Sequence, residues 1–148
     1  MAMASPSNQA LLETATRAAH EAGLHALREA HRANEYHALL PHDLKLVLDK
    51  ESQDVAETHI LSRFSTHAIV GEEGSTLSST SPWEWIIDPI DGTVNFAHGS
   101  SYWCSSVAVR HQGEIVAGAV YAPVLDQLYT APENSPLASM TALFSPLQ

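Results

Sequence analysis

The sequence predicts an α+β fold in which two amphipathic helices pack on one face of an antiparallel sheet. The apolar residues of segments 7–32 and 50–64 recur at intervals of three and four, which is typical of a helix with one buried side. Apolar, β-prone runs follow between residues 84 and 130, and the turns between the last of them are too short for a parallel crossover. We therefore expect both helices to cover the same face of this sheet.

The first helix is predicted over residues 7 to about 32. Its apolar side is rich in alanine, which suits close packing against a sheet or a second helix. The residues of this side are Ala10, Leu11, Ala15, Ala18, Ala19, Ala22, Ala26, Leu27 and Ala30. Residues 33–42 show no periodicity, and we expect a loop there.

A short strand is predicted over residues 43–49, because Leu44, Leu46 and Leu48 alternate with other side chains. The second helix follows over residues 50–64. Asp49 stands where an N-cap residue belongs, and the local sequence favours this structural role for its carboxylate.

Residues 68–70 are predicted to form a strand, and a glycine-framed turn with two acids, Glu72 and Glu73, follows at once. Such a pair in a turn is most often a solvated loop. The next segment, residues 75–82, is polar and has no core-forming pattern, so we expect it to be a loop.

The segment of residues 83–96 is the centre of the chain. An apolar run ends in Asp88 and Asp91, which are separated by Pro89 and Ile90. Because proline fixes its own φ and favours an extended residue before it, both carboxylates can point at one locus and hold a metal ion. The N–H groups of Gly92 and Thr93 could form an anion-binding concavity beside them. The alternative is an ordinary surface turn built on Asp-Pro and Asp-Gly.

Beyond this segment we predict a loop over residues 97–101 and strands over 102–110, 115–121 and 128–130. Residues 1–130 are expected to form one domain. Residues 131–148 contain three prolines without a sustained period and are expected to be an irregular tail.

Composition excludes several classes of function. The net charge of −10 argues against nucleic-acid binding. No apolar run approaches the roughly 18 residues of a membrane span, and the N-terminus lacks the pattern of a signal peptide, so we expect a cytoplasmic protein. The histidines are scattered without zinc-ligand spacing. The single cysteine, Cys104, excludes an internal disulfide and is interpreted as a packed thiol.

The run Asp88-Pro89-Ile90-Asp91-Gly92-Thr93, with Asn95-Phe96 behind it, resembles the signature of the inositol monophosphatase family. These are magnesium-dependent, lithium-sensitive phosphatases of sugar phosphates and nucleotides. The resemblance extends from about residue 7 to residue 130 and corresponds to the N-terminal half of a family member. It implies the first half of a layered α/β/α/β/α fold. The family's Trp-Asp-x-Ala-Ala-Gly motif is absent, since no Trp-Asp pair occurs in this sequence.

The resemblance also implies roles for particular residues. A first Mg²⁺ would be held by Glu72, Asp88 and the carbonyl of Ile90, and a second ion by Asp91. Asp49 and Thr93 would orient the attacking water, so that the implied catalytic residues are Asp49, Thr93 and Glu72. The substrate would contact Asp91, Gly92 and Thr93.

The resemblance also concerns two further positions. Glu73 would lie outside the ligand shell. Lys45 and Leu46 stand where the family has Val-Thr, which leaves the role of the lysine open.

The function implied is hydrolysis of a small phosphorylated metabolite. Inositol monophosphate, histidinol phosphate, 3′-phosphoadenosine phosphate and fructose bisphosphate all remain open as substrates. The alternative is a truncated, catalytically incompetent fragment that binds a cation weakly or acts only by association. We expect no nucleic-acid or membrane partner, and a homodimer stays open beside the monomer.

Overall fold

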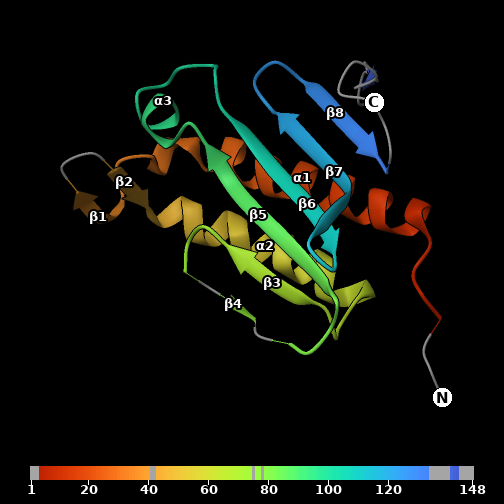
Figure 1. The fold of residues 1–148 in the computed structure, drawn as a ribbon. Helices are drawn as coiled ribbons and strands as arrows, with labels where there is room; N and C mark the ends of the chain where they lie inside the picture. The colour runs from red at the N-terminus through yellow and green to blue at the C-terminus, as the bar shows by residue number, and fades with distance from the viewer. Residues whose placement is uncertain (1–3, 41–42, 75, 78, 134–140, 144–148) are drawn as a thin grey trace.

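The computed structural model describes residues 4–40, 43–74, 76–77, 79–133 and 141–143. Two helices, α1 (Asn8–Arg28) and α2 (Val47–Arg63), lie together on one face of a seven-stranded sheet (Figure 1). This arrangement confirms the predicted α+β fold with both helices on the same face. In the described part of the chain, no helix is long and apolar enough to cross a membrane.

The sheet has the strand order β4-β3-β5-β6-β7-β8-β9. Its strands are β3 (Ala68–Gly71), β4 (Thr76–Leu77), β5 (Trp83–Asp91), β6 (Cys104–His111), β7 (Glu114–Ala122), β8 (Gln127–Pro132) and β9 (Thr141–Leu143). The pairing is antiparallel from β5 to β9, which confirms the predicted arrangement of the strands after residue 84.

One pair departs from that expectation, because β3 runs parallel to β5. After β3 the chain turns back through β4, which is antiparallel to β3. It then begins β5 at the end of the sheet where β3 began, so that β3 and β5 run in the same direction. The rule of short turns applies only where strands follow one another directly, so it did not predict this pair.

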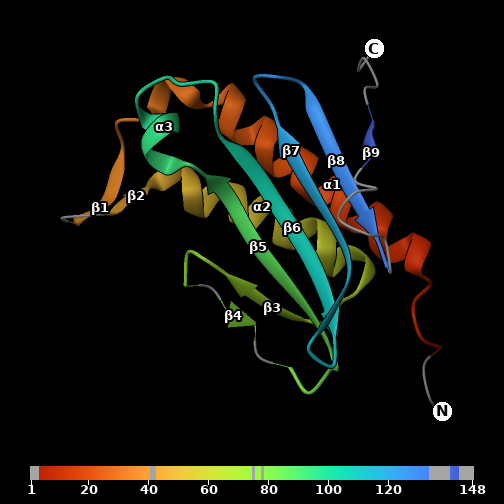
Figure 2. The same cartoon turned by 45° about the horizontal axis from the view of Figure 1, so that its top comes forward.

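The alanine-rich side of α1 packs across β5, β6, β7 and β8 (Figure 2). Ser7 caps the helix by accepting a hydrogen bond from the N–H of Ala10 at 3.1 Å. The fit is close. A Cβ atom added at Gly23 would lie 2.8 Å from Tyr121 Cδ1 and 2.9 Å from Pro123 Cγ. Small side chains on α1 thus allow the helix to approach the sheet.

Several predicted boundaries are wrong near the two helices. The first helix ends at Arg28 and is followed by a 3₁₀ turn, η1 (Ala30–Arg32). The predicted loop of residues 33–42 contains strand β1 (Tyr36–Leu40), which pairs with β2 (Asp43–Leu46) as a hairpin. Helix α2 begins at Val47, inside the predicted strand of residues 43–49.

Asp49 is therefore not the N-cap of α2. The N-cap residue is Leu46, whose side chain has no acceptor, and Asp49 is the third residue of the helix. Its carboxylate reaches back and accepts a hydrogen bond from the N–H of Leu46 at 2.8 Å. The acid still satisfies a free backbone donor at the helix start, but from the third helical position.

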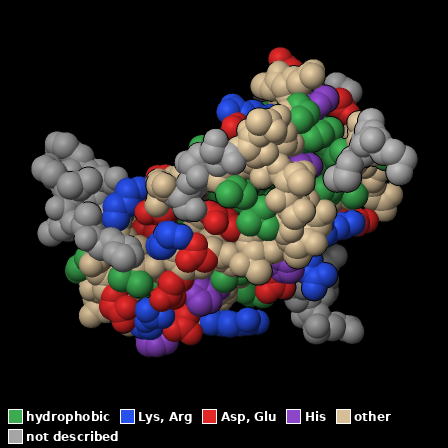
Figure 3. Space-filling model, turned by 90° about the horizontal axis from the view of Figure 1, so that it is seen from below, with side chains coloured by type: hydrophobic (Ala, Val, Ile, Leu, Met, Phe, Trp, Pro, Cys, Tyr) green, Lys and Arg blue, Asp and Glu red, His purple; other side chains and the backbone are tan. Residues whose placement is uncertain are grey.

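Other corrections concern loops and the C-terminal segment. The predicted loops of residues 75–82 and 97–101 overlap strand β4 and the end of a short helix, α3 (Thr93–Ala97). The segment predicted as an irregular tail contains the end of β8 and strand β9, and residues 134–140 and 144–148 lie outside the described residues. On the side of the molecule seen in Figure 3, basic side chains lie beside acidic ones and form no patch of their own.

Candidate active site

The parallel pair of β3 and β5 brings the first two predicted metal ligands together. Gly71 is the register partner of Ile87, and the N–H of Glu72 donates to the carbonyl of Ile87 at 3.1 Å. The residue after Gly71 therefore lies beside the residue after Ile87. The carboxyl groups of Glu72 and Asp88 are within hydrogen-bonding reach of each other.

A β-bulge places Asp91 on the same side of the sheet as Asp88. Asp88 pairs with Ser106 of β6, and Asp91 pairs with Cys104, so that three steps on β5 match two steps on β6. Side chains in a regular strand alternate between faces, and residues three apart would point to opposite sides. The extra residue restores the phase between the two acids. Pro89 and Ile90, which make up the bulge, are both buried.

The ionised form of Asp88 is disfavoured. Burial is the main cause, and the neighbouring carboxyl group of Glu72 and the charge of Asp91 add to it, so that the pKa of Asp88 rises to about 8. Asp88 Oδ1 is buried and has no hydrogen-bond partner. A buried carboxylate oxygen of this kind needs either a proton or a cation.

Asp49 lies on the helix side of the same region and is 1% exposed. Burial raises its pKa to about 7, and the charges of Glu73 and Glu72 act in the same direction. The hydrogen bond from Leu46 and the charge of Lys45 oppose this rise. Two neighbouring carboxyl groups of the site, Asp49 and Asp88, thus favour their protonated forms near neutral pH.

Lys45 supplies the positive charge of the site. Its Nζ lies 3.2 Å from Glu73 Oε1 and 3.6 Å from Glu72 Oε1. The Glu72 side chain is 48% exposed, whereas that of Glu73 is 8% exposed. Glu73 is thus the more buried of the two acids, and the outer position expected for it stays a prediction. The sequence alone left the role of Lys45 open. Its alternation with Leu44 and Leu46 nevertheless predicts that it lies on the side of the strand opposite the two leucines.

The end of the signature is a tight turn into α3. Gly92 adopts φ = +90°, and a Cβ atom there would lie 3.1 Å from the carbonyl oxygen of Tyr102. This explains why glycine is needed at this position. The Thr93 hydroxyl donates to the carbonyl of Ile90 at 3.0 Å. Among the described residues no hydrogen bond joins Thr93 to Asp49, so their joint role in orienting a water stays a prediction.

A second small core anchors this turn from below. Ile90 and Phe96 are buried together with Trp103, and the rings of Phe96 and Trp103 meet edge to face at a centroid distance of 4.8 Å. Leu46 and Leu48 belong to the same cluster. The apolar residues next to Asp49 and Asp91 therefore fix the two segments that carry these acids.

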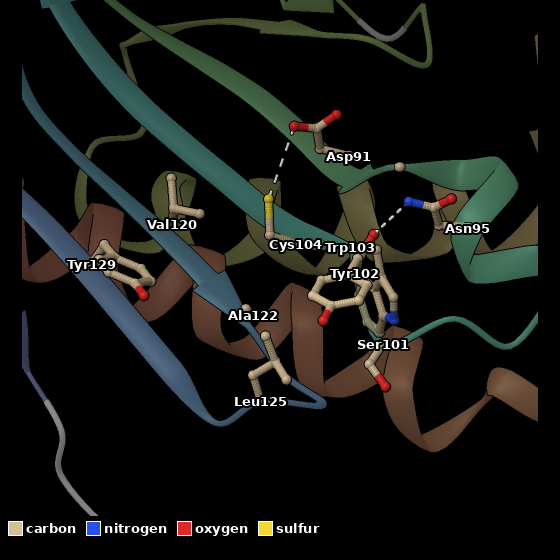
Figure 4. A pocket seen from close by; sticks show the side chains of 11 residues that line it. Asp91, Asn95, Ser101, Tyr102, Trp103, Cys104, Val120, Ala122, Leu125 and Tyr129 are labelled. Atoms are coloured by element: carbon tan, nitrogen blue, oxygen red, sulfur yellow. Dashed lines mark hydrogen bonds between the residues drawn. The ribbon is translucent and has the colours of Figure 1, made fainter.

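A cavity of about 440 Å³ opens beside Asp91 (Figure 4). Its walls include Gly92, Asn95, Tyr102 and Cys104. The Cys104 thiol lies 3.9 Å from Asp91 Oδ2, and burial followed by the charge of Asp91 raises the pKa of this thiol to about 11. The thiol is thus protonated and unreactive at neutral pH, which fits its interpretation as a packed side chain.

The described residues fit a hard divalent cation in part. Glu72 and Asp88 provide oxygens, and the unpartnered Oδ1 of Asp88 lies where a cation would satisfy it. Within the described ranges, however, no three His, Cys, Asp or Glu side chains are grouped closely enough to hold one ion. One oxygen of Asp91, Oδ2, faces the Cys104 thiol (Figure 4).

The sequence profile of the inositol monophosphatase family matches residues 7–142, which is most of the chain. The chain belongs to the inositol monophosphatase family. The match extends beyond residue 130, where the resemblance was expected to end, and reaches into strand β9.

Members of the inositol monophosphatase family with known sequences and structures resemble the chain over about half of their own length. An inositol-1-monophosphatase of Rhizobium meliloti is 34% identical over 128 residues, which cover 84% of this chain and 48% of the relative. The Nus factor SuhB of Vibrio cholerae is 34% identical, with 82% of this chain and 46% of the relative covered. The crystal structure of SuhB from Bartonella henselae superposes with a TM-score of 0.80 at 29% identity, covering 85% of this chain and 50% of that one.

Proposed function

We propose that this protein is a Mg²⁺-dependent phosphatase of small phosphorylated metabolites. The observation that carries the proposal is the acidic pair of Glu72 and Asp88, whose unpartnered Asp88 Oδ1 lies at the carboxyl edge of the parallel strands. Family membership supports the reaction type. The names of the relatives make an inositol phosphate the first substrate to test.

In this proposal Glu72, Asp88 and the carbonyl of Ile90 would hold a first Mg²⁺, and Asp91 would hold a second. When bound, these ions would polarise the phosphate and lower the pKa of an attacking water. Asp49 and Thr93 orient that water. Because the pKa of Asp49 lies near 7, the residue can accept a proton at neutral pH.

The substrate's phosphate would lie over the turn at Gly92 and Thr93. Gly92 carries no side chain that would keep an ester away from the backbone, and its positive φ directs the chain into the first turn of α3. The ester's alcohol part would extend into the cavity beside Asp91, where Asn95 and Tyr102 line the wall. A cavity of this size suits a small metabolite.

A second candidate function is cation binding without turnover. It is favoured by the lack of a three-ligand cluster among the described residues. Such a protein would bind a cation weakly or act by association, with itself or with another protein.

The test is phosphate release by the purified chain with Mg²⁺, using the four phosphate esters named above, together with calorimetric titration of Mn²⁺. The Asp88→Asn variant is the control. We expect release that needs both Mg²⁺ and Asp88. Mn²⁺ binding without release would favour the second function, and absence of both binding and release would refute the phosphatase and the cation-binding function, leaving only association.

A further inference from the structure

Gln53 is a buried polar residue that the proposed reaction does not use. It lies on α2 one turn after Asp49, so that both side chains point from the same helix face towards the ends of β3 and β5. The side chain is 0% exposed. A buried amide requires partners for both its oxygen and its nitrogen.

Both partners are present, and they determine which way the amide faces. Gln53 Oε1 accepts a hydrogen bond from the backbone N–H of Glu73 at 3.0 Å. Gln53 Nε2 donates to Glu57 Oε1 at 2.8 Å. Because an N–H can only donate and a carboxylate can only accept, the reversed orientation of the amide would lose both bonds.

Gly71 provides the space in which this amide lies. A Cβ atom added at Gly71 would fall 2.1 Å from Gln53 Nε2 and 2.3 Å from Oε1. The backbone at Gly71 does not have a positive φ, so its lack of a side chain, not its conformation, is what the contact needs. The amide of Gln53 therefore lies directly against the main chain where β3 ends.

We infer that Gln53 is a positioning residue that holds Glu72 in place to bind a cation together with Asp88. Glu72 is flanked by two fixed backbone groups. Its own N–H is bonded to Ile87, and the next N–H, of Glu73, is bonded to Gln53. The first bond ties the turn to the sheet and the second ties it to α2. The inference rests on the proposed cation site and adds to it a residue that touches neither ion nor substrate.

The experiment compares Gln53→Leu with Ser52→Ala in the full chain. Leucine keeps the volume but cannot accept from Glu73. Ser52 is the matched control, because it is the neighbouring residue on α2, is 0% exposed, and its Oγ has no hydrogen-bond partner. Two quantities are measured, namely hydrogen exchange of the Glu73 amide by NMR without metal, and the affinity for Mn²⁺ by calorimetry.

We expect the Glu73 amide to lose protection and Mn²⁺ affinity to fall about tenfold or more in Gln53→Leu, as is usual when a residue that orients a ligand is lost. Ser52→Ala should change neither. The double variant Gln53→Glu with Glu57→Gln exchanges the two groups and preserves both hydrogen bonds, so it should restore affinity to within about threefold of wild type.

A steric test uses Gly71. Gly71→Ala should destabilise the protein, and adding Gln53→Ala should recover stability by removing the collision, whereas Mn²⁺ affinity should stay low because the acceptor for Glu73 is gone. Unchanged Mn²⁺ affinity or a still-protected Glu73 amide in Gln53→Leu would overturn the inference. If the wild-type chain binds no Mn²⁺, the proposed cation site fails, and the inference fails with it.

Discussion

The raised pKa of Asp88 adds a pH dependence to the stability of the protein, and one substitution should remove it. In the unfolded chain this carboxyl titrates near 3.8, and in the folded chain near 8. Folding therefore takes up a proton between these values. The contribution of Asp88 to stability is fully present below about pH 4 and is lost as pH rises through about 8.

The size of this loss follows from the interval of pH. Between pH 5.5 and pH 8 the folded state holds up to one proton more at Asp88 than the unfolded state does. The free energy of unfolding therefore falls by up to about 1.36 kcal/mol per pH unit, or by about 3 kcal/mol over this interval. The exposed side chain of Glu72 can turn away from Asp88 and relieve part of the repulsion. We therefore expect the loss of stability due to Asp88 to be roughly half of the upper limit, about 1.5 kcal/mol.

The measurement is urea unfolding of wild type and Asp88→Asn at pH 5.5 and 8.5 in EDTA. The difference between the two proteins is the relevant quantity, because His20 and His67, whose pKa values are lowered by burial, and Asp49 titrate in both. The amide introduced by Asp88→Asn cannot titrate, so the variant should become relatively more stable at high pH. Mg²⁺ should stabilise only the wild type at pH 8.5. Parallel pH profiles for the two proteins would refute the reasoning.

Three further substitutions have defined expectations. Lys45→Met removes the ammonium group beside Glu72 and Glu73, which would compete with a bound cation for these carboxylates. Calorimetry should therefore show Mn²⁺ binding that is severalfold tighter, by about 1 kcal/mol. Weaker binding would show that the lysine supports the site. Gly92→Ala must adopt a positive φ against the Tyr102 carbonyl and should lower unfolding free energy by about 1–3 kcal/mol, while an unchanged urea midpoint would contradict the strain. Gly23→Ala should cost about 1–3 kcal/mol by pushing α1 from Tyr121, with full Mn²⁺ affinity retained; lost affinity at full stability would contradict a purely packing role.

The sequence predicted those parts of the fold whose signals are local. The alanine side of α1 repeats over several turns, and the strands from β6 to β8 are joined by turns that permit only one kind of pairing. The β1 and β2 hairpin was missed because its first strand, Tyr36–Leu40, carries no alternating pattern.

The sequence likewise predicted which acids belong to the site, but not the strand pairing that brings them together. The acids at positions 72, 88 and 91 were identified from the resemblance, but the parallel register that joins Glu72 to Asp88 depends on a pairing between distant segments. Asp49 was placed on the wrong helix position because acids are common both at the N-cap and in the first turn of a helix, although the two positions satisfy different backbone N–H groups. Gln53 carried a usable signal, since it follows Asp49 by four residues and so shares its helix face.

The bulge between Asp88 and Asp91 imposes a length constraint on this segment. Substitutions of Pro89 or Ile90 alter the buried anchors but leave both acids on one face. If the bulge is kept, inserting one residue would shift Asp91 out of phase and turn it towards the face of the sheet that α1 and α2 cover. Deleting one residue would turn the bulge into regular strand. Asp88 and Asp91 would then still lie on one face, but one of the two buried residues between them would be lost. The number of residues between the two aspartates is thus constrained by the pairing of β5 with β6, whichever side chains lie between them.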